Sequence, residues 1–170
     1  MAQNLSMPDI PVITIEAEQL FAATQFGQRV AKELEARGTQ LAAENRRIEA
    51  DLEKEEGEIT AKRAVLEPEA FRNLADAFDA RVQQVRAEQD EKARELARAS
   101  DQAQFEFLQA IAPILEIMMN ERGASVILDR RAVFLSADAS DITQQAIARI
   151  DAELGDGTAL NQTPDAPTND

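Results

Sequence analysis

The chain contains no cysteine, histidine, tryptophan or tyrosine. Without cysteine it can form no disulfide, no thiol nucleophile and no cysteine-based zinc site. Histidine, cysteine and tyrosine often serve enzymes as acid, base or nucleophile, so only carboxylates, lysines and hydroxyls remain for such work. No glycine-rich phosphate-binding loop is present either. We therefore expect a protein that is not an enzyme and that holds no cofactor or metal.

Long apolar runs are also missing. No stretch approaches the roughly eighteen apolar residues needed to cross a membrane. Residues 1–11 have neither the basic start nor the apolar core of a secretory signal peptide, although an already processed chain would look the same. Alanine supplies much of the 44% hydrophobic content, so large core-forming side chains are scarce. This scarcity favours an elongated helical structure over a globule.

Basic charge is too sparse for a nucleic-acid-binding protein. The net charge is −14, and residues 26–122 carry 21 acidic and 15 basic side chains. Such a mixed-charge surface lacks the basic stripe that a phosphate backbone requires. We expect no nucleic-acid partner and peripheral membrane contact at most. The acidic run at residues 53–58 could bind a cation, but a solvated helix face is the favoured interpretation.

A heptad pattern dominates the first half of the chain. Leu34, Leu41 and Ile48 recur every seven residues and, after one four-residue step, Leu52, Ile59 and Leu66 do so again. This narrow apolar seam, with a single phase shift, is typical of a coiled coil that contains a stutter. The pattern predicts a helix from about residue 26 to 66.

A second long helix is predicted from about residue 69 to 121. Because proline disfavours helix at the preceding residue, the Glu67-Pro68-Glu69 segment indicates the tip of a hairpin. Phe71, Leu74 and Phe78 begin the apolar seam of this helix. Packing within the hairpin is the simpler role for them, and contact with a bound protein is the alternative. Further on, apolar residues at 105–119 surround most of the helix, so they need more than one covering partner.

Short β-strand patterns flank the helical region. Residues 11–15 are rich in β-branched side chains and predict one strand. Residues 125–129 and 132–135 predict two more, joined by a tight turn at Arg130-Arg131, a basic pair that could bind a phosphate or carboxylate or simply face water. Asp141 is a good N-cap for a last helix, and Gly155 would end it.

These elements predict an α+β fold. Residues 10–25 and 123–155 would form a small β-rich head, residues 26–122 a long antiparallel coiled-coil arm with its tip near 67–69, and residues 156–170 a disordered acidic tail. Three short strands leave exposed sheet edges, which oligomerisation would cover. The residues expected to join the subunits are Val12, Ile13, Ile15, Ile111, Leu115, Met118, Val126, Ile127, Leu128, Val133 and Phe134.

The chain resembles the Skp/OmpH-type periplasmic chaperones over roughly residues 12–152. The opening strand leading to Leu20-Phe21, the heptads from Leu34 to Leu52, and above all the order of elements from Gly123 to Ile150 carry the resemblance. It implies a homotrimer whose strands join in one β-rich body and whose arms enclose a cavity. It further implies a periplasmic, ATP-independent holdase that keeps unfolded outer-membrane β-barrel proteins from aggregating.

The sequence departs from the family's pattern in its charge. Arms of better-known members are commonly rich in Lys and Arg, whereas these arms are mildly acidic. The basic lipopolysaccharide-binding cluster proposed for the family has no convincing match here, so that site is not transferred. The alternative hypothesis for function is a non-catalytic coiled-coil scaffold or adaptor that binds one folded partner.

Overall fold

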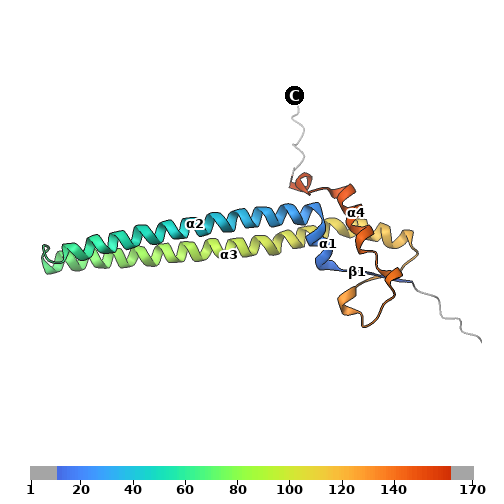
Figure 1. Ribbon diagram of the computed structural model, residues 1–170, viewed down its shortest axis with the longest axis horizontal. Helices are drawn as coiled ribbons and strands as arrows, with labels where there is room; N and C mark the ends of the chain where they lie inside the picture. Colours follow the sequence, from blue (N-terminus) through green and yellow to red (C-terminus); the bar gives the residue numbers. More distant parts are fainter. Residues whose placement is uncertain (1–10, 162–170) are drawn as a thin grey trace, which may run out of the picture. The chain divides into compact units, whose positions relative to one another are not determined.

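The computed structural model of the protein describes residues 11–161 and is mostly helical, with one small sheet (Figure 1). Contacts divide it into two compact units: residues 32–102 form one, and the segments up to residue 31 and from residue 103 onward form the other. We call these the arm unit and the head unit. The head unit is discontinuous in sequence, and each unit is described by itself below.

The elements follow one another in an order that places short strands at both ends of the long helices. Along the chain these are β1 (Val12–Ile15), α1 (Ala17–Ala23), α2 (Gln25–Lys62), α3 (Pro68–Glu121), β2 (Val126–Asp129) and α4 (Thr143–Leu154), with three 3₁₀ turns, η1 (Arg130–Ala132), η2 (Asp138–Ser140) and η3 (Thr158–Asn161).

The head unit contains a two-stranded parallel sheet. β1 pairs with β2 so that Val12 lies opposite Val126 and Ile15 opposite Asp129. The backbone N–H of Ile142 donates to the carbonyl oxygen of Thr14 (2.9 Å), which attaches the start of α4 to the other side of β1. Two segments more than a hundred residues apart in sequence therefore meet in one sheet.

The expected third strand at residues 132–135 does not form within the described residues 11–161. Instead of a tight hairpin, the chain enters η1, where the Asp129 carboxylate accepts the backbone N–H of Arg131 (2.9 Å). The N–H of Val133 then donates to the carbonyl oxygen of Arg130 (3.2 Å). Because these local bonds hold the chain in a turn, residues 132–135 do not fold back onto β2.

Three phenylalanines lie at the centre of the head unit. The ring of Phe107 on α3 is 5.2 Å from that of Phe21 on α1 and 5.4 Å from that of Phe26 on α2, measured between centroids. Phe26 and Phe107 are almost completely buried. Edge-to-face and tilted pairs at this spacing are favourable beyond their buried area. The cluster thus joins α1, α2 and α3 within the head unit.

Helix α4 covers another side of the same core. Ile142, Ala146 and Ile150 are fully buried and form the packed face of this helix. Gly155 ends the helix with a φ of +58°, as the sequence predicts for a glycine stop.

The chain remains packed beyond α4. The Arg29 guanidinium donates to the carbonyl oxygen of Asp156 (2.6 Å), and Gly157 is buried against the Phe26 ring. Residues 156–161 therefore differ from the expected disordered tail, whose remainder, residues 162–170, lies outside the described residues. Contacts through glycine and backbone leave little apolar pattern in a sequence, and for this reason the sequence predicts a disordered tail here.

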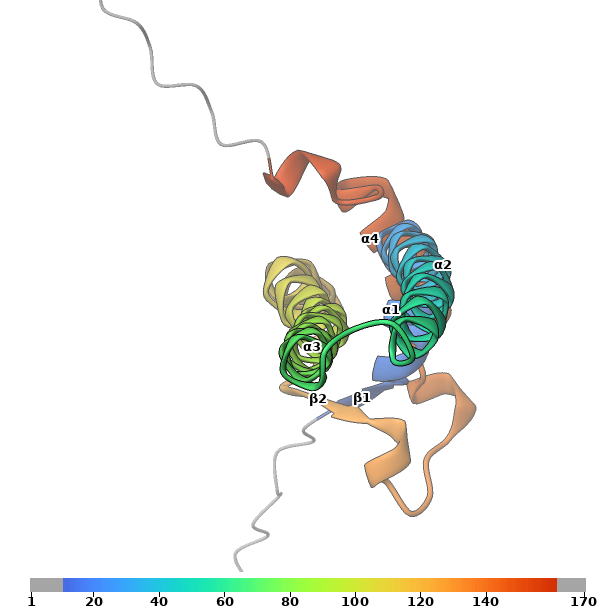
Figure 2. The ribbon, with the colours of Figure 1, turned by 90° about the vertical axis from the view of Figure 1, so that its left-hand side faces the viewer.

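In the arm unit, α2 and α3 lie side by side (Figures 1 and 2). The Glu44 carboxylate accepts from the Lys92 ammonium (2.5 Å), and further along Glu55 pairs with Arg81. As the residue number rises on α2, that of its partner falls on α3. The connecting turn spans residues 63–67, and Pro68 is the first residue of α3, so the reversal comes a few residues before the predicted 67–69.

A network of ion pairs in the head unit closes the loop between β2 and α4. The Arg130 guanidinium donates to the Asp141 carboxylate (2.7 Å), and it also lies near Asp138 and Glu16. The second carboxylate oxygen of Asp141 accepts from the N–H and the hydroxyl of Thr143 (2.9 and 2.5 Å). The Thr143 hydroxyl bond, and then the Arg130 guanidinium, lower the pKa of Asp141.

Replacing glycine by alanine should have opposite effects on stability at two positions of α2. A Cβ on Gly27 would lie 1.6 Å from the carbonyl oxygen of Phe21, so Gly27→Ala should destabilise the chain by about 1–3 kcal/mol. A Cβ on Gly57 meets nothing within 4 Å, so Gly57→Ala should stabilise the arm helix by about 0.5–1 kcal/mol. Thermal unfolding followed by circular dichroism at the helix band measures both. Equal shifts in the two variants would contradict this packing.

Asp141 predicts a pH-dependent contribution to stability. Because its pKa is lower in the folded chain, the contribution is complete above the ordinary value of 3.8 and disappears as the pH falls through the folded value. Asp141→Ala should cost about 1–2 kcal/mol at neutral pH, and Asp141→Asn less, since the amide oxygen can still accept from Thr143. Urea titrations should show the difference between the wild-type and Asp141→Asn chains narrowing below pH 3.8. A constant difference would contradict the prediction.

Candidate functional site

One face of the two-stranded sheet is apolar and partly open to solvent. Val12 and Val126 lie opposite each other in the parallel register, and Leu128 follows on the same face of β2. All three side chains are exposed. Three adjacent exposed aliphatic side chains on a sheet of only two strands make a surface that could be covered by another polypeptide.

The loop that follows η1 carries the most exposed apolar side chains of the described residues. Phe134 is 105% exposed and Leu135 is 84% exposed, relative to reference values for the free residues. Burial of such side chains is worth roughly 1.5–3 kcal/mol each. The Arg130–Asp141 ion pair closes the loop eleven residues apart, so these two side chains project from an anchored segment.

The eleven residues expected at a subunit interface fall into three groups. Ile13, Ile111 and Met118 are buried in the core of their own chain and cannot offer surface to a partner without unfolding. Ile15, Leu115, Ile127 and Val133 are half-buried. The exposed ones are Val12, Val126, Leu128 and Phe134.

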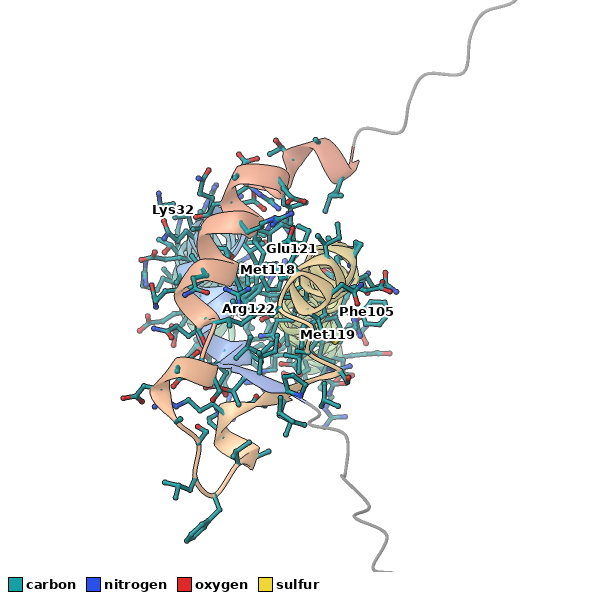
Figure 3. All side chains as sticks on the ribbon, turned by 90° about the vertical axis from the view of Figure 1, so that its right-hand side faces the viewer. Lys32, Phe105, Met118, Met119, Glu121 and Arg122 are labelled. Carbon is teal, nitrogen blue, oxygen red and sulfur yellow. The ribbon has the colours of Figure 1, made fainter. Side chains whose placement is uncertain are left out.

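Helix α3 presents exposed apolar side chains that the predicted interface did not include. Phe105 and Leu108 are 56% and 54% exposed, and Ile117 is also exposed. In Figure 3, Met118 lies on the side of α3 toward the centre of the head unit, whereas Phe105 lies on the opposite side. Leu108 follows Phe105 by three residues, Leu115 comes seven residues after Leu108, and Met119 comes four residues after Leu115. That spacing predicts a second apolar stripe along the helix, which we call the outer stripe of α3.

The arm unit has an apolar seam that is only partly covered. Along α3, Phe71, Leu74 and Phe78 are half-buried between the helices rather than fully exposed. The guanidinium of Arg63 lies 5.9 Å from the centre of the Phe71 ring, and that of Arg81 lies at the same distance from Phe78. Each ring therefore has a cation beside it. This arrangement allows packing within the arm and leaves apolar area for a bound protein.

Ion pairs on the arm surface supplement the sparse seam. A hydrogen bond from Lys92, and then one from Gln89, lowers the pKa of Glu44. On α3 itself, the Arg98 guanidinium lowers the pKa of Glu91. These groups are exposed, so each pair adds only a small amount of stability and is weakened by salt.

Within residues 11–161 the side chains bring together no group of three histidine, cysteine or carboxylate ligands suited to a metal ion. In the same part of the chain, no helix combines the length and the apolar character required to span a bilayer.

Comparison with known proteins places this arrangement in a family. The OmpH-like outer membrane protein family matches residues 11–150. Among solved structures, the OmpH-like protein of Caulobacter crescentus CB15, described as a candidate outer membrane chaperone, superposes with a TM-score of 0.70 at 23% identity, covering 86% of each chain. At that identity the likeness shows the fold alone. The search of curated proteins gave no match. Since the match of residues 11–150 includes both compact units, the chain belongs to the OmpH-like outer membrane protein family.

Proposed function

We propose that this chain is an ATP-independent holdase chaperone of the periplasm. Three copies form a trimer, and their arms enclose unfolded outer-membrane β-barrel proteins and keep them from aggregating. The observation that carries this proposal is the family match, because it spans the head unit and the whole arm unit and not a coiled coil alone.

The exposed apolar side chains of the head unit support association of subunits. The sheet face of Val12, Val126 and Leu128, the loop side chains Phe134 and Leu135, and the outer stripe of α3 would all be covered by neighbouring copies. An open sheet edge and several hundred Å² of apolar surface are commonly covered in this way in homo-oligomers.

The arm unit supports weak, multiple contacts with a bound chain. Most of its seam is half-buried, and between residues 89 and 104 only Leu96 is a large apolar residue. Thin packing of this kind favours a compliant arm that can adapt to clients of different size. Several weak contacts inside one enclosure produce a high effective concentration, so no tight single pocket is required. Release needs no nucleotide if insertion into a membrane lowers the free energy of the client.

The trimer is tested by light scattering coupled to size exclusion. The absence of tryptophan and tyrosine requires detection by refractive index. We expect three times the chain mass of 18.7 kDa. The double variant Phe134→Ser and Leu135→Ser should shift the mass toward a monomer, since it removes about 3–6 kcal/mol of burial per subunit. Val65→Ser and Leu66→Ser, which remove exposed apolar side chains from the arm, are the matched control. A wild-type monomer at micromolar concentration would contradict the trimer.

Holdase activity is tested by diluting a urea-unfolded outer-membrane β-barrel protein into buffer without ATP. When this chain is present in a near-stoichiometric amount, it should suppress the light scattering that aggregates of the β-barrel protein produce. Combining Phe71→Ala, Leu74→Ala and Phe78→Ala should raise the amount needed by several-fold, because less apolar area meets the client. The control variant Phe71→Leu, Leu74→Met and Phe78→Leu keeps most of that apolar area and should preserve activity. Failure with several unrelated β-barrel proteins, together with tight binding of one folded partner, would favour the scaffold hypothesis instead.

A further inference from the structure

On one side of the arm unit, α2 and α3 leave a groove with an apolar floor. The floor residues are half-buried side chains contributed by both helices, namely Ile48, Leu52, Phe78, Val82 and Val85. Because they are only partly covered by their own chain, they retain apolar area that a ligand could remove from water. The groove lies entirely within residues 45–90, inside one compact unit.

The walls of this groove are acidic. On α2, Glu49, Glu53 and Glu56 are spaced by four and three residues, which places them on one face of the helix. On α3, Asp79 and Asp90 are three helical turns apart and again share a face. Arg86 is the single basic residue that lines the groove, against these five carboxylates. The groove therefore combines an apolar floor with a strongly negative rim.

The five rim carboxylates have no ion-pair partner within the described part of the chain, whereas several other carboxylates of the arm unit do. Glu44 pairs with Lys92, Glu55 with Arg81 and Glu91 with Arg98. Like charges along one rim repel one another, and a cation that approaches the groove relieves that repulsion.

We propose that this groove binds extended segments in which apolar side chains are flanked by lysine or arginine. The inference rests on the chaperone function proposed above and deepens it by naming the chemistry of the bound segment. The ammonium and guanidinium groups would meet the rim formed by Glu49, Glu53, Glu56, Asp79 and Asp90, while the apolar side chains cover the floor.

The dimensions of the groove suit such a segment. Residues 45–56 of α2 extend over roughly 16 Å at about 1.5 Å per residue. An extended chain covers that length with about five residues. Strands of outer-membrane barrels alternate apolar and polar side chains, so every second residue would face the floor and the intervening ones could reach the rim. A second copy of this chain is a poor occupant, because its arm carries the same acidic stripe.

The proposal is tested with two fluorescently labelled peptides of about seven residues and identical apolar positions. One alternates these positions with lysine and the other with glutamate. Anisotropy titrations with the full chain should show the lysine peptide binding about tenfold more tightly in about 20 mM salt, and the difference should largely disappear in about 500 mM salt, where the screening length is a few Å. Equal affinity for the two peptides at low salt would overturn the proposal.

Charge variants locate the binding surface. The triple variant Glu49→Gln, Glu53→Gln and Glu56→Gln should lose most of the preference for lysine. Its matched control, Glu35→Gln, Glu67→Gln and Asp101→Asn, removes the same number of exposed carboxylates outside the groove and should retain the preference. The triple variant Glu49→Lys, Glu53→Lys and Glu56→Lys should reverse the preference toward the glutamate peptide. Circular dichroism confirms that each variant remains helical. An equal loss of preference in the two neutralised variants would mean that overall charge, and not the groove, selects the peptide.

The peptide-binding and aggregation assays together separate this inference from the proposed function. If the wild-type chain suppresses aggregation of β-barrel proteins but shows no charge preference for peptides, the groove inference fails and the chaperone function stands. If the wild-type chain suppresses no aggregation, the proposed function fails. A change of oligomeric mass in the Glu49→Gln, Glu53→Gln and Glu56→Gln variant would identify the groove as a subunit contact and would overturn its assignment to cationic segments.

Discussion

The packing of Phe21, Phe26 and Phe107 is the contact on which the rest of the head unit depends. Each ring comes from a different helix, and the three meet within 5.2–6.3 Å of one another. Gly27 makes the contact possible, because any side chain at that position would collide with the end of α1. The start of α2 and the later part of α3 are thereby held against the same core that supports β1 and α4. Few large side chains are available in this composition, so their concentration at one place is what allows a core to form at all.

The arm unit is stabilised in a different way. Its seam consists of half-buried aliphatic and phenylalanine side chains, supplemented by exposed ion pairs such as Glu44 with Lys92. Each pair contributes little in water, and a two-helix seam buries less area per residue than a globular core. This incomplete burial leaves apolar surface accessible in a structure that is nevertheless regular.

Charge distinguishes the two sides of the arm unit. Carboxylates whose partners lie on the facing helix are neutralised, whereas those along the groove of Ile48 and Phe78 are not. Excess negative charge along a groove attracts positive ligands and repels other copies of the same chain. The acidic side chains, which the sequence shows as a net charge and a run at residues 53–58, become directional through the geometry of two adjacent helices.

Residue order alone determined the long helices, their seam and the absence of histidine, cysteine and tyrosine, because heptad spacing and composition are local properties of a sequence. Resemblance in the order of elements from Gly123 to Ile150 identified the family. Tertiary structure decided which stripe of α3 is buried. Phe107, Ile111 and Met118 face the core, while Phe105 and Leu108 face outward, although both stripes have helical spacing. Tertiary structure also decided that Gly157 packs on Phe26. Residues 132–135, by contrast, follow a turn that a local hydrogen bond to Asp129 stabilises. The physical reason is that burial, strand pairing and close approach at a glycine depend on partners distant in sequence, which no local pattern specifies.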